Sequence, residues 1–428
     1  MFGLIDGNNF YASCERVFQP ELRKKPLIVL SNNDGCAIAR SEEAKALGVK
    51  MGQPLHKIPP RIREKLAIRS ANFTLYGDMS NRVLAVLREA VPRIEPYSID
   101  ESFLDLTGIP DLENFARALR DRVHRWVGIP NCVGIGPTKT LAKLANHVAK
   151  DALRKPGSYP GELAGVADLS ALPSSALDDV LTATPVGEIW GVGRRYSEKL
   201  AALKIHTAFD LRAASPGMIQ KRFGVVLART QSELSGVPCL DLEEIEPDRQ
   251  QIMVSRTFGE RVSDPQAIGE ALATFASRAA EKLRSRGLVA GAVGIFAGSD
   301  PFHPELGEHF PQRVINLPEA TGDTRAILAA IRRLQRRFLK ENQPYKRAGV
   351  WLMDLARPSD APADLFSPAA ANDDSLMVVM DAINRRFGRG TVGLAASGWR
   401  KHASWGMRQD HLSRHFSTSF RDLPGAAC

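Results

Sequence analysis

Two patterns of apolar spacing alternate along the first 150 or so residues. Short runs of mostly apolar residues have the length of buried strands, and longer stretches with apolar residues three and four apart have the spacing of amphipathic helices. Asn33-Asp34-Gly35, between two short runs, is typical of a hairpin turn. The pattern predicts an α/β region. Its strands are expected at 2–9, 26–30, 36–39, 93–97, 103–106 and 131–136, and its helices at 41–46, 73–90, 112–127 and 138–150.

The pattern changes after about residue 154. Residues 154–185 are rich in Pro, Gly, Ser and Ala, which indicates a domain boundary. Residues 185–195 end one helix, form a Gly-x-Gly hairpin and begin another helix, which is a helix–hairpin–helix pattern. After an acidic linker at 243–248, elements in the order β-α-β-β-α-β between 252 and 355 predict a ferredoxin-like fold. From Arg357 the regular pattern is lost. The fold class is therefore α/β and α+β, in several domains.

The composition is that of a globular protein with a polyanionic partner. A chain of 428 residues is too long for one core, so we expect about two to four domains. A net charge of +9 favours nucleic acid as the partner, ahead of a membrane surface. No apolar run approaches ~18 residues and no basic leader opens the chain, so we expect neither a membrane span nor a signal peptide. Scattered cysteines without a C-x-x-C pair argue against structural zinc and disulfides and favour the cytoplasm.

Three acids are candidate metal ligands. Asp6 stands near the end of the first expected strand, and Asp100 and Glu101 lie between two strand-like runs. Adjacent side chains on a flat strand point to opposite faces, so Asp100 and Glu101 share a cation only if the chain bends between them. Lys143 and Lys150 share one face of the following helix and would neutralise phosphates. The set fits phosphoryl transfer with two Mg²⁺ ions. A solvated turn and, for Asp6, a helix cap are the alternatives.

The turn Gly191-Val192-Gly193 is a candidate DNA contact. Its glycines let the backbone approach another molecule closely, and N–H groups at a helix start bind a DNA phosphate without reading sequence. Arg194 and Arg195 follow the turn and add positive charge. An ordinary corner between two helices is the alternative.

Several longer motifs make the chain resemble the Y-family translesion DNA polymerases, and within them the UmuC type, the catalytic subunit of bacterial DNA polymerase V. The resemblance covers nearly the whole chain. Its motifs are Asn8-Asn9-Phe10-Tyr11-Ala12-Ser13-Cys14-Glu15, Leu30-Ser31-Asn32-Asn33-Asp34-Gly35-Cys36, Ala44-Lys45-Ala46-Leu47-Gly48-Val49-Lys50-Met51-Gly52, Tyr97-Ser98-Ile99-Asp100-Glu101 and Thr138-Lys139-Thr140-Leu141-Ala142-Lys143-Leu144-Ala145-Asn146.

The resemblance implies a right-hand polymerase. Its expected parts are a palm of antiparallel or mixed sheet plus helices at 1–19 and 73–165, small fingers at 20–72, a helical thumb with the helix–hairpin–helix at 166–240, a ferredoxin-like little finger at 241–356, and a partner-binding C-terminal tail at 357–428.

The resemblance also implies roles for single residues. Asp6, Asp100 and Glu101 would hold two catalytic Mg²⁺ ions. Tyr11 would be the steric gate, because a rigid ring against C2′ rejects a ribonucleotide's 2′-hydroxyl by overlap; a core tyrosine is the alternative. The remaining roles are contacts to nucleotide and DNA. The incoming triphosphate would be contacted by Lys45, Lys150 and the backbone N–H groups of Phe10 and Tyr11. The thumb would contact DNA through Gly191, Gly193, Arg194 and Arg195. The template phosphates would be contacted by Ser255, Arg256 and Thr257.

One motif departs from the family. A sliding-clamp peptide is usually a glutamine followed three and four residues later by Leu and Phe, and this chain has Pro362 where the glutamine belongs, before Leu365 and Phe366. We therefore expect binding to the sliding clamp to be weakened or lost. The resemblance also implies primer–template DNA, dNTPs, a UmuD-type dimer and RecA as partners, and action at the nucleoid.

The sequence thus predicts an error-prone DNA polymerase of low processivity that copies damaged templates in the bacterial SOS response. The fingers are short, which fits a roomy pocket for the new base pair. Two alternatives remain open here: a catalytically inactive DNA-binding subunit, and a palm-fold nucleotide cyclase. The three acids argue against the first, and the helix–hairpin–helix and the basic third domain argue against the second.

Overall fold

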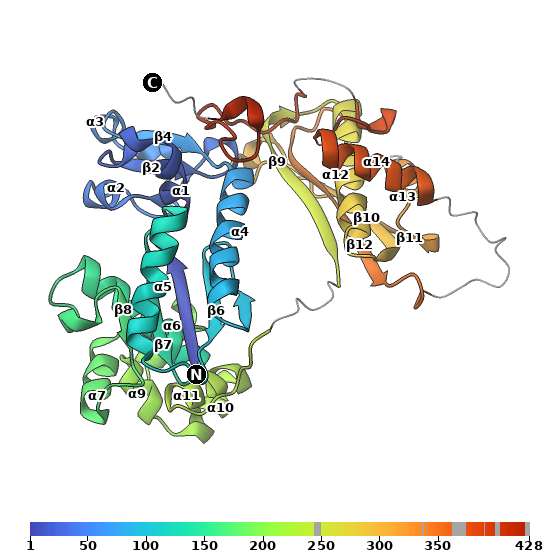
Figure 1. The fold of residues 1–428 in the computed structure, drawn as a ribbon. Coiled ribbons are helices and arrows are strands. Elements are labelled where there is room, and N and C mark those ends of the chain that lie inside the picture. Colours follow the sequence, from blue (N-terminus) through green and yellow to red (C-terminus); the bar gives the residue numbers. More distant parts are fainter. Residues whose placement is uncertain (244–249, 336–337, 362–373, 389, 399–402, 424–428) are drawn as a thin grey trace. The chain divides into compact units, whose positions relative to one another are not determined.

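The computed structural model describes residues 1–243, 250–335, 338–361, 374–388, 390–398 and 403–423. The chain forms two compact units (Figure 1). The first comprises residues 1–31, 36–246 and 411–428, and the second comprises residues 32–35 and 247–410. The chain therefore returns to the first unit near its C-terminus.

A five-stranded sheet forms the centre of the first unit. Its strands are β1 (Phe2–Gly7), β5 (Ile94–Pro96), β6 (Glu101–Asp105), β7 (Asn131–Gly136) and β8 (Val166–Asp168). The strand order is β5-β6-β1-β7-β8, so β1 lies in the middle. It pairs antiparallel with both β6 and β7, whereas β8 runs parallel to β7. The sheet is therefore mixed, as expected.

Helices cover both faces of this sheet. They are α1 (Phe10–Phe18), α4 (Phe73–Ala90), α5 (Leu112–Val127) and α6 (Lys139–Arg154). Successive strand residues face opposite sides. Ile5 and Leu104 share a core with residues of α1, α4 and α5, whereas Leu4 and Phe103 pack with Ala142 of α6. The alternation of side chains along β1 and β6 thus determines which helices pack on each face of the sheet.

Two glycines of β7 let α6 lie very close to the sheet. A Cβ atom on Gly134 would lie 2.0 Å from the backbone nitrogen of Asn146, and one on Gly136 would lie 2.8 Å from that of Ala142. Because backbone atoms leave no room for a side chain there, only glycine fits at either position. The close packing holds α6, with its lysines, against the strand next to β1.

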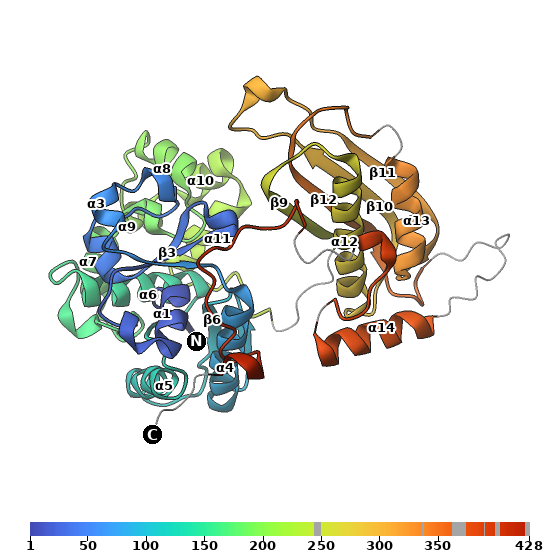
Figure 2. The ribbon, with the colours of Figure 1, turned by 90° about the horizontal axis from the view of Figure 1, so that it is seen from above.

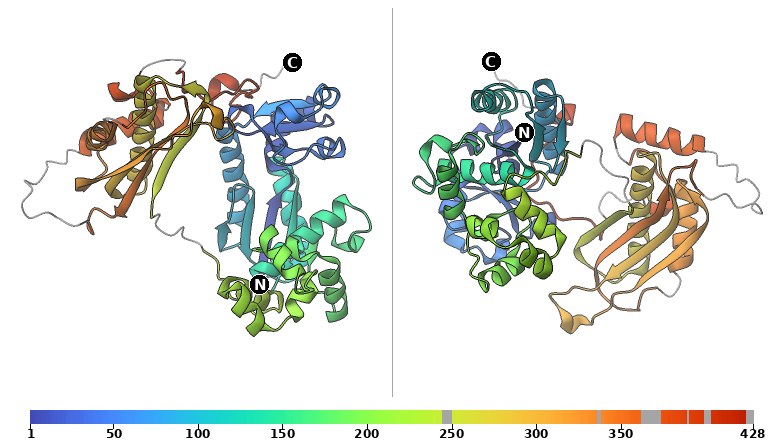
Figure 3. Two further views of the ribbon diagram at one scale, coloured as in Figure 1. Left: turned by 180° about the vertical axis from the view of Figure 1, so that it is seen from behind. Right: turned by 90° about the horizontal axis from the view of Figure 1, so that it is seen from below.

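A smaller sheet and a group of helices complete the first unit. The sheet consists of β2 (Leu27–Leu30), β3 (Ala37–Arg40) and β4 (Ala67–Ser70), in the order β3-β2-β4, and carries α2 (Glu42–Ala46) and α3 (Pro60–Arg63). The helices are α7 (Ser174–Ala183), α8 (Arg194–Ala201), α9 (Ala208–Ala213), α10 (Pro216–Phe223) and α11 (Val225–Leu234). These five helices share a core with α6 and gather at one end of the first unit (Figure 3).

The second unit is a four-stranded sheet with two helices on one face (Figure 2). Its elements follow one another as β9 (Ile252–Val262), α12 (Pro265–Arg284), β10 (Val289–Gly298), β11 (Gln312–Thr321), α13 (Thr324–Gln335) and β12 (Tyr345–Ala356). This confirms the predicted order β-α-β-β-α-β. The strand order is β11-β10-β12-β9, so the first and third strands lie at the edges. A ferredoxin-like sheet has its first and third strands in the centre. The predicted ferredoxin-like strand arrangement is therefore wrong, although the order of elements is right. The order of elements along the chain does not determine which strands pair.

The C-terminal region contains a helix that the sequence did not predict. Residues Asp374–Phe387 form α14. Its apolar residues Leu376, Met380, Ile383 and Phe387 recur at helical spacing, so the signal for a helix was present in the sequence. The expectation of an irregular chain from Arg357 onward is therefore wrong for this stretch.

Among the described residues, none of the helices has the length and apolar character needed to span a membrane.

Candidate active site

The three predicted acids meet where β1 ends and β6 begins. Asp6 and Glu101 are direct partners in the antiparallel register of these strands. Asp100 precedes β6, and its carbonyl oxygen accepts a hydrogen bond of 2.9 Å from the N–H of Gly7. The site lies at the tip of the hairpin that joins β5 to β6, so the chain bends here, as the two adjacent acids require.

The hydroxyl of Ser98 holds this bend. Its Oγ accepts hydrogen bonds from the backbone N–H groups of Asp100 (3.3 Å) and Glu101 (3.0 Å), and it donates to Oδ1 of Asp100 at 2.7 Å. Serine hydroxyls stabilise turns by bonding to nearby backbone in this way. The sequence motif contained Ser98, but its spacing alone did not indicate this contact.

Two lysines of α6 neutralise two of the acids. Nζ of Lys143 lies 2.9 Å from both carboxylate oxygens of Glu101, and Lys150 forms an ion pair with Asp6. Lys143 also lies over the ring of Tyr97, 4.5 Å from its centre. Glu101 is thus paired and Asp6 is buried at 7% exposure, whereas Asp100, partly exposed, has the hydroxyl of Ser98 as its side-chain partner.

The environment of Asp6 disfavours its charge. Burial raises the pKa of Asp6 to about 7; Lys150 opposes the rise, and the nearby charges of Glu101 and Asp100 add to it. Within the described part of the chain, no three His, Cys, Asp or Glu side chains are grouped closely enough to hold a metal as they stand. Carboxylates are nevertheless the ligands that Mg²⁺ prefers, so the donor set fits such an ion once the lysines move aside.

Tyr11 is the second residue of α1, the helix that follows β1 and its Asp6 in the sequence. Its ring stacks on that of Tyr76 from α4, with centres 4.5 Å apart and planes 16° apart. The ring of Phe73 meets it edge-on at 5.9 Å. Tyr76 is fully buried whereas Tyr11 is partly exposed. The tyrosine ring is therefore supported from one side and accessible from another.

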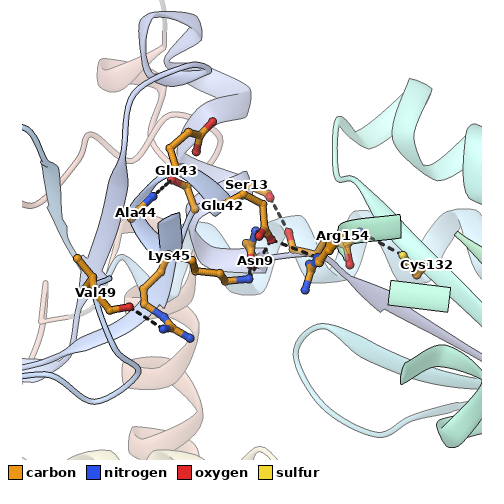
Figure 4. A network of polar contacts seen from close by, with 12 residues as sticks. Asn9, Ser13, Glu42, Glu43, Ala44, Lys45, Val49, Cys132 and Arg154 are labelled. Carbon is orange, nitrogen blue, oxygen red and sulfur yellow. Dashed lines mark hydrogen bonds and ion pairs between the residues drawn. The ribbon is translucent and has the colours of Figure 1, made fainter. Parts of the chain in front are cut away.

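The start of α1 lies next to a cluster of cations (Figure 4). Asn9, which precedes the buried Phe10, adopts a left-handed conformation, and no side chain caps the helix. Nζ of Lys45 donates to Oδ1 of Asn9 at 2.7 Å and to Glu42 at 2.9 Å. Free N–H groups at a helix start and nearby ammonium groups together attract phosphate.

Sequence reasoning missed two members of this cluster, Asn9 and Arg154. Nε of Arg154 lies 3.1 Å from Oε1 of Glu42, the oxygen that also binds Lys45. Burial raises the pKa of Glu42, but the hydrogen bonds from Lys45 and Asn9 bring it below its usual value. Arg154 follows Lys150 by four residues on α6, and that helical spacing was the signal that could have identified it.

The helix–hairpin–helix residues lie in the first unit, where Gly191 and Gly193 precede α8 and Arg194 and Arg195 begin it. Gly191 has a φ of 87°, which favours glycine, and a Cβ on Gly193 would meet no atom within 4 Å. Gly193 precedes α8 without a side-chain cap, and Arg194 and Arg195 are exposed. The backbone at this turn is therefore open to another molecule.

The predicted template contacts lie in the second unit, on the edge strand β9. Ser255, Arg256 and Thr257 pair with β12, opposite Gly349, Ala348 and Arg347. β9 is an edge strand, and the carbonyl oxygen of Thr257 accepts a hydrogen bond of 2.9 Å from Nδ2 of Asn33. Leu365 and Phe366, the predicted clamp contacts, lie outside the described residues.

Three family models match this chain. The impB/mucB/samB family matches residues 5–147, its C-terminal domain matches residues 249–365, and a domain of unknown function matches residues 374–426. The first match contains all three acids, Tyr11 and Lys45.

The chain is also similar over its whole length to curated proteins. Protein ImpB of Salmonella typhimurium is 44% identical over 99% of both chains, and protein UmuC of Salmonella typhimurium (strain LT2) is 43% identical over 99% of both. DNA polymerase IV of Moorella thermoacetica is 30% identical over 92% of this chain and 95% of its own.

Solved structures share the fold. A Y-family DNA polymerase chimera superposes with a TM-score of 0.64 at 21% identity, covering 83% of this chain and 99% of its own. DinB from Sulfolobus solfataricus gives 0.51 at 22% identity, covering 82% and 98%. With sequence, fold and site in agreement, the chain belongs to the impB/mucB/samB family and is a UmuC-type member of the Y-family DNA polymerases.

Proposed function

We propose that this protein is a template-directed DNA polymerase for translesion synthesis in the SOS response, which adds nucleotides from dNTPs to a primer across damaged template bases. The observation that carries the proposal is the register of β1 and β6, which places Asp6 opposite Glu101 with Asp100 beside them. Family membership supports the same activity. We infer the parts of the hand as expected: palm 1–19 and 73–165, fingers 20–72, thumb 166–240, little finger 241–356 and tail 357–428.

Asp6, Asp100 and Glu101 would hold two Mg²⁺ ions in this mechanism. Bound there, the ions would activate the primer 3′-hydroxyl and stabilise the leaving pyrophosphate. The protein's own contribution is to align the carboxylates on a hairpin tip that Ser98 holds in place. Lys143, released from Glu101, would add positive charge beside the reacting phosphate.

A second group of residues would bind the triphosphate. Lys45 and Lys150 would contact its oxygens, joined by Arg154, and the N–H groups of Phe10 and Tyr11 would complete the cradle. The ion pairs that these cations form support the proposed phosphate contacts. Lys150 is paired with Asp6, and Lys45 and Arg154 are paired with Glu42, so each cation already binds an anionic group. Tyr11 would be the steric gate against the 2′-hydroxyl, with its ring fixed by the stack on Tyr76.

The remaining contacts would be with DNA and partner proteins. We infer phosphate contacts from Gly191, Gly193, Arg194 and Arg195 in the thumb and from Ser255, Arg256 and Thr257 on β9. A UmuD-type dimer and RecA are proposed as partners on the strength of family membership, and the nucleoid as the place of action. Sliding-clamp binding through Leu365 and Phe366 would be weak, because Pro362 replaces the usual glutamine.

The proposal is tested by incubating the protein with Mg²⁺ and dNTPs, with and without a primer annealed to a longer template. We expect elongated primer in the first case and no turnover of nucleotide in the second. Release of pyrophosphate without DNA would favour a nucleotide cyclase instead. Binding of the duplex without elongation, even with UmuD-type and RecA proteins present, would favour an inactive subunit.

The raised pKa of Asp6 predicts how Mg²⁺ binding depends on pH. A carboxyl with a pKa of about 7 is mostly protonated at pH 6, so Mg²⁺ has to displace the proton. The apparent Mg²⁺ affinity should therefore rise about tenfold per pH unit up to about 7 and then level off. Titration calorimetry in buffers of different ionisation enthalpy would measure both the affinity and the released proton.

The matched control for this prediction is Asp6→Asn, which has no proton to release. It should bind Mg²⁺ more weakly, and its affinity should no longer change between pH 6 and pH 8. Equal affinities of the wild type at these two pH values would show that Asp6 does not act as a ligand with a raised pKa.

A further inference from the structure

Residues 411–423, the part of the last described stretch that belongs to the first unit, are called here the C-terminal segment. It lies beside the small sheet and the start of α4 (Figures 1 and 2). The N–H of Ser70, the last residue of β4, donates to the carbonyl of His411 at 3.0 Å, and the N–H of His411 donates to Oγ of Ser70 at 3.0 Å. The segment is thus joined to the end of β4 by one backbone hydrogen bond and by one hydrogen bond to a side chain.

Further contacts hold the segment on both helices next to Tyr11. The amide nitrogen of Asn72 donates to Oγ of Ser413 at 3.1 Å, while its oxygen caps α4. The ring of Phe416 stacks on that of Phe18 from α1, with centres 5.2 Å and planes 7° apart, and it is only 8% exposed. A tail that merely rested on the surface would not bury an aromatic ring in the core of the sheet's helices.

The segment reaches Tyr11 through a buried carboxylate. Oε1 of Glu15, a fully buried residue of α1, accepts a hydrogen bond from Oγ of Ser413 at 3.0 Å and another from the hydroxyl of Tyr76 at 2.8 Å. Tyr76 is the residue whose ring stacks on Tyr11. Ser413 is therefore connected to Tyr11 by one carboxylate and one aromatic ring.

We propose that the C-terminal segment helps to set the sugar selectivity of this polymerase, with Ser413 as a positioning residue that fixes the ring of Tyr11 through Glu15 and Tyr76. The inference rests on the proposed function of Tyr11 as the steric gate. It gives a role to part of the region, residues 374–426, that matches only a domain of unknown function.

The physical reason is that a buried carboxylate has to be satisfied by hydrogen bonds. Burial raises the pKa of Glu15, and the hydrogen bonds from Tyr76 and Ser413 oppose that rise. If Ser413 no longer donates, the hydroxyl of Tyr76 is left as the described donor to Oε1 of Glu15, and the geometry of that hydrogen bond changes. A change in how Glu15 holds this hydroxyl moves the Tyr76 ring, and with it the surface that supports Tyr11.

The experiment compares Ser413→Ala with wild type in single-nucleotide insertion. The readout is the ratio of kcat/KM for a dNTP to kcat/KM for the matching rNTP. This ratio does not depend on the fraction of active enzyme, so a general loss of folding leaves it unchanged. We expect Ser413→Ala to lower the ratio at least about threefold. Ser413→Thr, which retains the hydroxyl, should keep it near the wild-type value.

Ser417 provides a matched control within the same segment. Its Oγ is buried and makes no hydrogen bond to any described residue. Ser417→Ala therefore removes the same atom from the same segment without touching the path to Tyr11. It should leave the ratio unchanged.

A double variant tests the path itself. Tyr76→Phe removes the other donor to Oε1 of Glu15 while keeping the ring. Because both changes act on one oxygen atom, the losses from Ser413→Ala and Tyr76→Phe should not multiply in the double variant. Losses that multiply would mean that the two residues act independently, which would overturn the proposed path.

The variant Tyr11→Ala separates this inference from the function on which it rests. If Tyr11→Ala leaves the ratio unchanged, the steric-gate role itself fails. If Tyr11→Ala lowers the ratio but Ser413→Ala behaves like Ser417→Ala, the gate stands and the role of the C-terminal segment is overturned.

Discussion

Replacing Glu101 by alanine is expected to abolish primer extension, with a loss of about a thousandfold or more in kcat. Glu101 faces Asp6 across the strand pair, so its removal takes away one side of the proposed metal site. The fold should survive, because Lys143, left without its carboxylate, keeps its contacts with the rings of Tyr97 (4.5 Å) and Trp190 (5.7 Å). Rapid-quench primer extension under saturating Mg²⁺ and dNTP measures the loss.

Asp105 offers a control on the same strand. It lies at the other end of β6, opposite Phe2, and contacts Arg93 on the surface. Asp105→Asn should extend primers as the wild type does, and Glu101→Ala should still bind primer–template DNA with wild-type affinity. Extension by Glu101→Ala at a rate close to wild type would contradict the assignment of this carboxylate to the metal site.

Replacing Tyr11 by alanine is expected to let ribonucleotides enter, with the preference for dNTP over rNTP falling by about 100-fold or more. The ring is held by its stack on the buried Tyr76 and by the edge contact from Phe73, so it cannot easily turn away from a 2′-hydroxyl. Alanine leaves open space where the ring stood. Insertion of single dNTPs and rNTPs opposite the same template base measures the preference.

The variant Tyr11→Phe separates the ring from its hydroxyl. It keeps the stack on Tyr76, so discrimination by overlap should remain near the wild-type value. A preference that collapsed in Tyr11→Phe as it does in Tyr11→Ala would mean that the phenolic hydroxyl, and not the bulk of the ring, rejects the ribose.

Much of the local structure could be predicted because its signals are local. The helix expected at 112–127 forms over Leu112–Val127. Ser41 and Thr138 cap their helices through side-chain oxygens, as their positions before apolar stretches indicated. The bend between Asp100 and Glu101 followed from the alternation of strand side chains and occurs at the tip of a hairpin.

Other features depend on contacts between distant parts of the chain and could not be predicted. The element order of the second unit did not reveal that β10 and β12 occupy the centre of its sheet. Residues near an expected site were missed when their partner came from another element, as with Arg154 and Glu42. The contact of Ser413 with Glu15 spans 398 positions of the sequence.

The most direct test of the account is insertion of single nucleotides opposite each of the four template bases and opposite an abasic site, with Mg²⁺ and, if needed, UmuD-type and RecA proteins. The account predicts that the template base selects the dNTP inserted, that errors are frequent, and that the abasic site is copied. It also predicts that all insertion disappears in Glu101→Ala. The absence of templated insertion under every condition, by a protein that still binds the DNA, would contradict the central claim.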